Sequence, residues 1–303
     1  MQAFDFVSAR SVDEVVAVLA TGGERARPLS GGTDLLAQLK EGRRAYATVV
    51  DLKRIPELME VRIGADGLWL GASVPCHIVN NSADIQKMYP ALHDSTGLIG
   101  GTQIQGRASL GGNLCNASPA ADGIPNLIVH SVTAHIAGPN GTRQVAAEDF
   151  CTAPGRNVLQ NGEILVALQF PAPVKNFGAA YLRFIPRNEM DIAVVGVGAS
   201  VVLSDDGKTI QSARISLGAV APTPLFVKAA GEALAGQPVS EESFEKAAQI
   251  AWEAAKPISD MRGTIAQRKH LSGVLTKRAL RIAIDRARGT STVDSLGRLN
   301  GNG

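Results

Sequence analysis

The spacing of hydrophobic positions changes along the chain between the two-residue period of a strand and the 3.6-residue period of a helix. In the N-terminal part this pattern predicts alternating strands and helices. Residues 4–7 form a short apolar strand, and a capping box at residues 11–14 begins a helix. Residues 34–40 carry apolar side chains on one face, as an amphipathic helix does, and residues 48–52 form an apolar run typical of a buried strand. We therefore expect a small α and β unit at about residues 1–54.

A pattern richer in strands follows, up to residue 171. Residues 61–72 and 135–145 each hold two alternating runs that are joined by a turn sequence, Asp-Gly in the first and Pro-Asn-Gly in the second. Each pair predicts a hairpin, and residues 163–171 predict a further strand. Helices are expected between these strands, at residues 74–80, 83–89 and in part of 119–134.

The C-terminal part is predicted to be a separate unit after a Pro- and Gly-containing link near residues 171–178. Three long runs, with an Asp-Asp-Gly turn between the last two, predict three antiparallel strands at residues 179–184, 192–203 and 212–220. Helices are predicted at residues 224–234, 240–255 and 268–288. Residues 289–303 are polar and rich in glycine, so we expect a disordered tail there. The expected fold class is α+β, with a two-part N-terminal domain at residues 1–175 (subdomains about 1–54 and 55–175) and a C-terminal three-stranded antiparallel sheet with helices at 176–288.

Two glycine-containing segments carry the most distinctive chemistry. Residues 106–122 read Gly-Arg-Ala-Ser-Leu-Gly-Gly-Asn-Leu-Cys-Asn-Ala-Ser-Pro-Ala-Ala-Asp, and residues 29–36 read Leu-Ser-Gly-Gly-Thr-Asp-Leu-Leu. Backbone N–H groups that no Cβ shields can converge on an anion, and short polar side chains can hold a sugar or a ring beyond it. Either segment alone is more often a tight turn, but together they predict two walls of one pyrophosphate cleft. Neither matches G-x-G-x-x-G or the P-loop pattern.

Composition and charge narrow the function further. The chain has 303 residues, 45% of them hydrophobic, which suffices for two domains or one divided domain. Lys and Arg number 30 against 28 acidic residues, a net charge of +2, so nucleic acid is not an expected partner. No apolar run is long enough to span a membrane and the N-terminus lacks the pattern of a signal peptide, so we expect a cytoplasmic protein.

The residues that usually carry catalysis are not arranged for it. The 3 cysteines, Cys76, Cys115 and Cys151, are dispersed, which supports neither a disulfide framework nor an iron–sulfur cluster. The 5 histidines show no metal-ligand spacing, and no nucleophile motif is present. We therefore expect no catalytic side chain and no metal site in this chain, and a cofactor that performs the chemistry.

A resemblance to a known family supplies the identity of that cofactor. The chain resembles the FAD-binding medium subunit of molybdenum hydroxylases, a group that includes the flavoprotein subunits of aerobic carbon monoxide dehydrogenase and the corresponding domain of xanthine dehydrogenase. It implies a PCMH-type FAD-binding domain followed by a domain like the C-terminal domain of the carbon monoxide dehydrogenase flavoprotein. The motifs that carry the resemblance are Ser-Gly-Gly-Thr-Asp-Leu-Leu at 30–36, Thr-Gln-Ile at 102–104, Ala-Ser-Leu-Gly-Gly-Asn at 108–113, Asn-Ala-Ser-Pro-Ala-Ala-Asp at 116–122 and Arg-Asn-Glu-Met-Asp-Ile-Ala-Val-Val at 187–195.

The resemblance also implies which residues bind FAD. Asp122 would hold a polar group of the cofactor and Leu165 would flank it. Arg183, where several relatives have Lys, would stabilise the anionic reduced flavin. Arg187 and Asp191 match positions near the exposed side of the flavin, although a structural ion pair is an equal alternative. The pyrophosphate would be contacted mostly through the backbone of Leu29, Ser30, Gly31, Gly32, Thr33, Asp34, Ser109, Leu110, Gly111, Gly112 and Asn113.

The function that the resemblance implies is electron transfer within a larger complex. The subunit would take electrons from a [2Fe-2S] subunit and pass them to an external acceptor such as NAD, a quinone or oxygen. The molybdopterin-Mo cofactor and two [2Fe-2S] clusters are expected on partner chains, a large molybdopterin-binding subunit and a small [2Fe-2S] subunit, in a dimer of heterotrimers. Two alternatives remain open: a self-contained flavin oxidase, and an assembly subunit with a vestigial flavin cleft. The retained glycines of both segments speak against the vestigial cleft.

Overall fold

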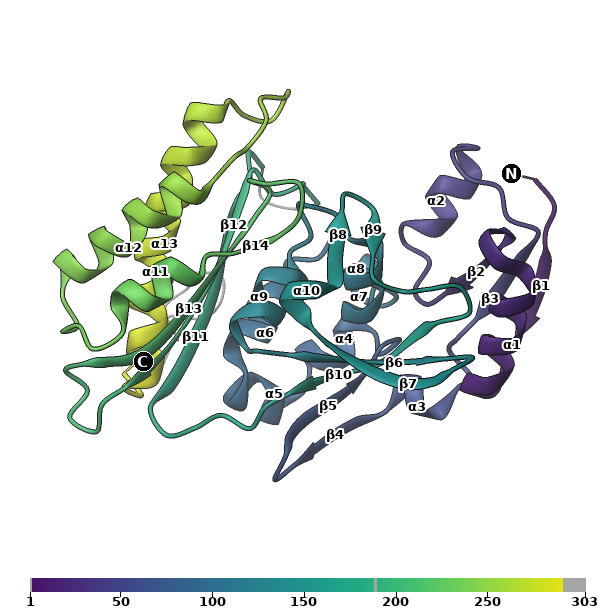
Figure 1. The fold of residues 1–303 in the computed structure, drawn as a ribbon, viewed down its shortest axis with the longest axis horizontal. Helices are drawn as coiled ribbons and strands as arrows, with labels where there is room; N and C mark the ends of the chain where they lie inside the picture. Colours follow the sequence, from purple (N-terminus) through teal and green to yellow (C-terminus); the bar gives the residue numbers. More distant parts are fainter. Residues whose placement is uncertain (1, 188–189, 291–303) are drawn as a thin grey trace.

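The computed structural model describes residues 2–187 and 190–290. Three sheets follow one another along the long axis of the molecule, as Figure 1 shows. The first sheet is parallel and has the order β1-β3-β2. The strands predicted at residues 4–7 and 48–52 are confirmed as β1 and β3, and β2 is a third strand between them in the chain. Ser11 caps the first helix as predicted, because its Oγ accepts a hydrogen bond from the Glu14 N–H at 3.2 Å. The elements are β1 (Asp5–Ser8), α1 (Val12–Gly22), a 3-10 turn (Gly23–Arg25), β2 (Ala26–Leu29), α2 (Leu35–Lys40) and β3 (Thr48–Asp51).

The second sheet is antiparallel and has the order β4-β5-β10-β6-β7. Both predicted hairpins are confirmed. Its strands are β4 (Val61–Gly64), β5 (Gly67–Gly71), β6 (Thr133–Gly138), β7 (Gly141–Ala146) and β10 (Ile164–Phe170). A short helix, α3 (Pro56–Met59), precedes this sheet in the sequence. The chain between β7 and β10 forms α10 (Ala147–Phe150), β8 (Cys151–Ala153) and β9 (Arg156–Asn157).

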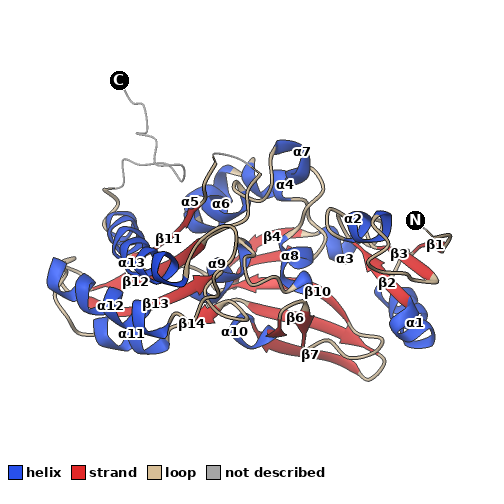
Figure 2. Cartoon of the chain, turned by 90° about the horizontal axis from the view of Figure 1, so that it is seen from above, coloured by secondary structure: helices blue, strands red, loops and turns tan. Residues whose placement is uncertain are grey.

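Six short helices connect β5 to β6. They are α4 (Cys76–Asn80), α5 (Ala83–Met88), α6 (Pro90–Thr96), α7 (Thr102–Gln105), α8 (Leu110–Asn116) and α9 (Gly123–Val129). Figure 2 shows α9 between the second and third sheets. The close approach of α9 to the third sheet needs Gly198, because a Cβ there would lie 2.8 Å from the Pro125 carbonyl oxygen.

The third sheet has the order β11-β12-β13-β14 and is antiparallel. The three predicted strands are confirmed as β11 (Phe177–Phe184), β12 (Val195–Leu203) and β13 (Ile210–Gly218), and the two-residue β14 (Leu225–Phe226) extends the sheet. The helix predicted from residue 224 begins only at residue 228, because Leu225 and Phe226 pair with β13 first. The helices are α11 (Lys228–Leu234), α12 (Glu241–Ala254) and α13 (Ile265–Ala287).

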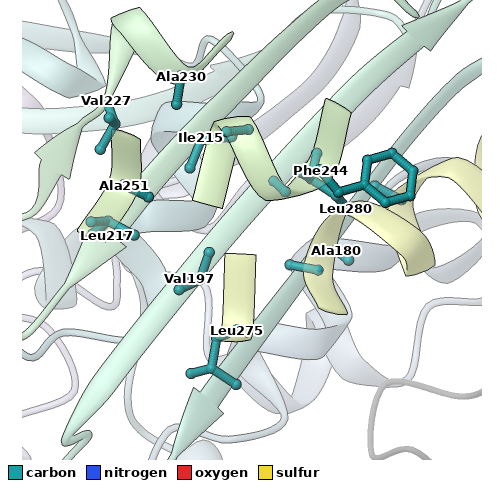
Figure 3. Close-up of a cluster of buried hydrophobic side chains, with 14 of the residues drawn as sticks. Ala180, Val197, Ile215, Leu217, Val227, Ala230, Phe244, Ala251, Leu275 and Leu280 are labelled. Carbon is teal, nitrogen blue, oxygen red and sulfur yellow. The ribbon is translucent and has the colours of Figure 1, made fainter. Parts of the chain in front are cut away.

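Small side chains let these helices pack closely on the third sheet. Figure 3 shows Ala230 and Ala251 of α11 and α12 facing Ile215 and Leu217 of β13, in a core of fully buried side chains. Of the predicted tail, residues 291–303 lie outside the described residues. Within the described part of the chain, no helix is long and apolar enough to cross a membrane.

Candidate functional site

The two glycine segments meet in the structure, as the sequence predicted. The first segment begins at the end of β2, and the second contains α8 and ends at the start of α9. The Ser30 and Ser109 hydroxyl oxygens lie 2.9 Å apart and share a hydrogen bond. A Cβ on Gly31 would overlap the Arg107 carbonyl group, so the two backbones are in direct contact. Two segments far apart in sequence therefore form one surface.

The second segment is helical, which corrects the expectation of a loop. Ser109 is the N-cap of α8, and its Oγ accepts a hydrogen bond from the Gly112 N–H at 3.0 Å. Gly111 and Gly112 thus occupy the first turn of a helix. The sequence carried a signal for this cap, since Ser is one of the residues favoured at the N-cap of a helix.

Gly111 and Gly112 have different neighbours. A Cβ on Gly111 would lie 2.7 Å from the Ala72 Cα, so this glycine lets α8 approach the end of β5. A Cβ on Gly112 would meet only the Ser109 Oγ at 3.1 Å and the Ser30 Cβ at 4.0 Å, so Gly112 faces the first segment. Gly31 and Gly111 are needed by the fold itself. Their retention therefore does not argue against a vestigial cleft, and Gly112 is the glycine that distinguishes the two cases.

Lys53 adds a cation to this surface that the sequence reasoning missed. Its Nζ donates to the Ser30 carbonyl oxygen at 3.0 Å and forms an ion pair with Asp51. The signal lies in the parallel pairing of β2 with β3, which brings Leu29 and Asp51 side by side. Ligands of parallel sheets bind beyond the carboxyl ends of the strands, and Lys53 follows such an end.

A second group of predicted residues gathers around Asp122, next to the start of α9. Arg183 Nη1 donates to Asp122 Oδ2 at 2.7 Å, and the Tyr181 hydroxyl donates to Asp122 Oδ1 at 2.7 Å. Asp122 is 8% exposed and the Arg183 side chain 3%. Burial raises the pKa of Asp122 to about 6, while the Arg183 charge and the Tyr181 hydrogen bond oppose that rise. Tyr181 was not among the predicted residues.

Asn113 joins the two groups. Its Oδ1 accepts a hydrogen bond from the Gly123 N–H, the first residue of α9, at 3.1 Å. Leu165 lies deeper, 2% exposed in β10, within the same apolar core as Leu110. The remaining predicted residues, Thr33 and Asp34, follow Gly32 towards the start of α2, and Gly32 adopts a positive φ of 77°.

The segment at 187–191 lies beside the Asp122 group. Arg183 Nη1 is 3.4 Å from the Asp191 carbonyl oxygen. Arg187 Nε is 3.6 Å from Asp191 Oδ2, and its Nη2 donates to the Met190 carbonyl oxygen at 3.0 Å. The alternative of a structural ion pair thus has a geometric basis. Residues 188 and 189 of this motif lie outside the described residues.

The cysteines lie in environments that suppress thiol chemistry. Burial raises the pKa of Cys76 and of Cys115 to about 12 and that of Cys151 to about 11. All three are free thiols. Among the described residues, no three His, Cys, Asp or Glu side chains gather as a metal site.

Comparisons with known proteins place this arrangement in a family. The family model described as the FAD binding domain in molybdopterin dehydrogenase matches residues 2–173. The chain belongs to the FAD-binding subunits of the molybdenum hydroxylases. A second model, described as the CO dehydrogenase flavoprotein C-terminal domain, matches residues 180–283.

Relatives and solved structures agree with this family. The xanthine dehydrogenase FAD-binding subunit of Escherichia coli O157:H7 is 31% identical over 291 residues, which cover 94% of this chain and 99% of the relative. The carbon monoxide dehydrogenase medium chain of Afipia carboxidovorans is 32% identical over 286 residues, with 94% and 98% covered. The structure of reconstituted CO dehydrogenase from Oligotropha carboxidovorans matches with a TM-score of 0.90 at 30% identity, over 94% of this chain and 99% of that chain. These relatives are oxidoreductase subunits, and the chain is one by the same evidence.

Proposed function

We propose that this chain holds FAD at the contact between its two glycine segments and transfers electrons within a molybdenum hydroxylase complex. The hydrogen bond between Ser30 and Ser109 carries the proposal, because it joins the two segments into one polar surface. FAD, when bound, supplies the storage of two electrons that can arrive singly. The chain itself supplies binding and orientation.

The residues at the contact suit a pyrophosphate. Gly112 has no side chain on the face that it turns to the first segment, which leaves its backbone accessible to a phosphate group. The Lys53 ammonium group donates to the Ser30 carbonyl oxygen and so holds the first segment in place, while its pairing with Asp51 reduces the positive charge that it offers to an anion. The proposed contacts are Leu29, Ser30, Gly31, Gly32, Thr33, Asp34, Ser109, Leu110, Gly111, Gly112 and Asn113.

Asp122 is proposed to hold a polar group of the cofactor. Each carboxylate oxygen has two lone pairs, so the bonds to Tyr181 and Arg183 leave acceptor capacity on both oxygens. Arg183 is proposed to act through this pair, and Leu165 to form part of the apolar support beneath α8. Because Asp122 neutralises it, Arg183 stabilises a negative flavin less than an unpaired cation would.

The partners are proposed from the family. A small [2Fe-2S] subunit would donate electrons, a large molybdopterin-binding subunit would oxidise the substrate, and the complex would be a cytoplasmic dimer of heterotrimers. The relatives' names support a multi-chain enzyme, since one is a medium chain and another an FAD-binding subunit. The proposed domains are residues 1–175, with subdomains at about 1–54 and 55–175, and residues 176–288.

Two measurements test the proposal. The purified full chain should show a flavin absorption spectrum, or gain one on titration with FAD with quenching of the flavin fluorescence; a colourless chain that takes up no FAD would overturn the binding step. Purification of the tagged chain from its host should bring molybdenum and iron with it. If FAD comes with the chain but no metal and no other chain, the self-contained oxidase replaces the subunit.

A further inference from the structure

A buried ion pair connects the C-terminal helix to the N-terminal two thirds of the chain. Asp94 lies in α6 and is 2% exposed, and Arg286 lies in the last turn of α13. Arg286 Nη1 is 2.6 Å from Asp94 Oδ2 and its Nη2 is 3.0 Å from Asp94 Oδ1. Nη1 also donates to the Ala179 carbonyl oxygen at 2.8 Å. A bidentate pair of this kind fixes both side chains in orientation as well as in distance.

The same carboxylate also holds the strand that reaches Asp122. The Tyr181 N–H donates to Asp94 Oδ2 at 3.1 Å, while the Tyr181 hydroxyl donates to Asp122 at 2.7 Å. Two residues further along β11, Arg183 donates to the other oxygen of Asp122. The Tyr181 ring packs against the backbone of β12, since a Cβ on Gly196 would lie 2.5 Å from its hydroxyl oxygen.

We propose that Arg286 is a positioning residue for the flavin site, acting through Asp94 and Tyr181 on the Asp122–Arg183 pair. This inference rests on the proposed function only in that FAD is placed next to the Asp122–Arg183 pair. Arg286 holds the Asp94 carboxylate in place, and Asp94 holds the backbone of Tyr181. Tyr181 in turn supplies one of the two protein donors that keep Asp122 ionised and turned towards Arg183.

The effect of removing Arg286 follows from the charges that face each group. Asp94 is faced by Arg286, by the Tyr181 N–H and by His93, and Asp122 by Tyr181 and Arg183. Arg286 also acts on His130, whose pKa it lowers. Without Arg286, Asp94 is a buried charge without its main partner, so its carboxylate moves and no longer accepts the hydrogen bond of the Tyr181 N–H. Tyr181 then loses its anchor, Asp122 loses a donor, and the pKa of Asp122 rises further.

The test compares the full-length wild type with Arg286→Met, first without FAD. The pKa of the Asp122 carboxyl group, followed as the midpoint in a titration of the NMR chemical shift of its carboxyl carbon, should be about 6 in the wild type. In the variant the pKa should lie above about 7. The dissociation constant for FAD at neutral pH should rise about tenfold. An unchanged midpoint together with an unchanged dissociation constant would overturn the proposal. A wild type that binds no FAD would overturn the proposed function instead, and the titration would still test the relay.

Matched variants separate positioning from general loss of structure. Arg281→Met removes another arginine of α13, one paired with Glu241 at the surface, and should change neither value. The double variant Asp94→Asn/Arg286→Met removes the unpaired charge but keeps an oxygen for the Tyr181 N–H. Its Asp122 midpoint and its dissociation constant for FAD should therefore lie close to those of the wild type. A double variant as impaired as Arg286→Met would contradict the relay. Should Arg286→Met fail to fold, Arg286→Lys replaces it: a smaller rise of the Asp122 midpoint supports the proposal, and no rise overturns it.

Discussion

Ser30 and Ser109 are 79 positions apart in the chain, yet their hydroxyl oxygens lie 2.9 Å apart. Ser30 follows a strand of the first sheet and Ser109 caps a helix that packs on the second sheet. The contact therefore depends on how two sheets are arranged, and it brings Gly112 to face the first segment. The next prediction tests whether that surface holds FAD.

Gly112→Val should weaken FAD binding by about tenfold or more, because its side chain fills the space between the two segments. The change should cost little stability, because valine is a better helix former than glycine by a few tenths of a kcal/mol and the atom nearest to the new Cβ would be the Ser109 Oγ at 3.1 Å. Fluorescence titration with FAD and thermal unfolding of the same samples measure the two effects.

Two glycine variants are the controls for Gly112→Val. Gly106→Ala should change neither value, since the nearest atom to its Cβ would be the Gln103 carbonyl oxygen at 3.5 Å. Gly111→Ala should instead destabilise the fold by about 1–3 kcal/mol, because its Cβ collides with Ala72. Retained FAD affinity in a folded Gly112→Val variant would place the cofactor elsewhere.

Lys53→Met/Asp51→Asn should lower FAD affinity with little change in its dependence on salt. The double change removes the cation next to Ser30 without leaving Asp51 as an unpaired, nearly buried charge. Because one charge of each sign is removed and the bond from Lys53 to the Ser30 carbonyl oxygen is lost, we expect a loss of about threefold to tenfold at low and at high ionic strength. Titration at two salt concentrations measures this, with the exposed Lys40→Met as control. A loss that disappears at high salt would show that Lys53 acts through its charge and not by holding the Ser30 carbonyl group.

Much of the local structure could be predicted from the sequence. The Ser11 cap and the Asp66-Gly67 hairpin depend on residues a few positions apart, and both are confirmed. Residues 110–116 show the limit of such reasoning: two adjacent glycines suggested a loop, but the Ser109 cap and packing against Ala72 make the segment a helix.

The site was harder to predict, because its contacts join distant parts of the chain. The glycine segments carry recognisable motifs, and a resemblance could point to them. Lys53 and Tyr181 carry no motif of their own. The parallel pairing of two strands positions Lys53, and a strand that packs against α9 positions Tyr181. Only three-dimensional packing brings these side chains to Ser30 and Asp122.

His130→Phe should cost stability at neutral pH and progressively less as the pH falls. His130 is buried against Tyr89, Phe170 and Phe177, and burial lowers its pKa to about 4 from an ordinary 6.5. Between these values the unfolded chain binds a proton that the folded chain does not, so the stability from neutral His130 is present above pH 6.5 and lost as the pH falls towards 4.

Phenylalanine keeps the ring but cannot titrate. The difference in unfolding free energy between wild type and variant should therefore shrink by about 3 kcal/mol over this range. Urea unfolding at a series of pH values measures it, and taking the difference cancels the contribution of Asp122. A difference independent of pH would mean that His130 titrates normally in the folded protein.

Arg268→Met should destabilise the C-terminal part by about 2–4 kcal/mol. Arg268 is 3% exposed; its Nη1 donates to the carbonyl oxygens of Val194 at 2.7 Å and Ala219 at 3.0 Å, and its Nη2 is 2.7 Å from Asp260 Oδ1. Losing it leaves two carbonyl groups without their donor at the start of β12 and after β13.

The surface arginine of the same helix supplies the comparison. Arg281→Met breaks an exposed pair with Glu241 and should cost no more than about 1 kcal/mol. Urea unfolding of the wild type and both variants measures the two losses of unfolding free energy. Because Val194 lies three residues after Asp191, Arg268→Met should also disturb the segment beside the Asp122–Arg183 pair and weaken FAD binding, whereas Arg281→Met should leave it unchanged. Equal losses of stability in the two variants would show that the three hydrogen bonds of Arg268 contribute no more than one surface ion pair.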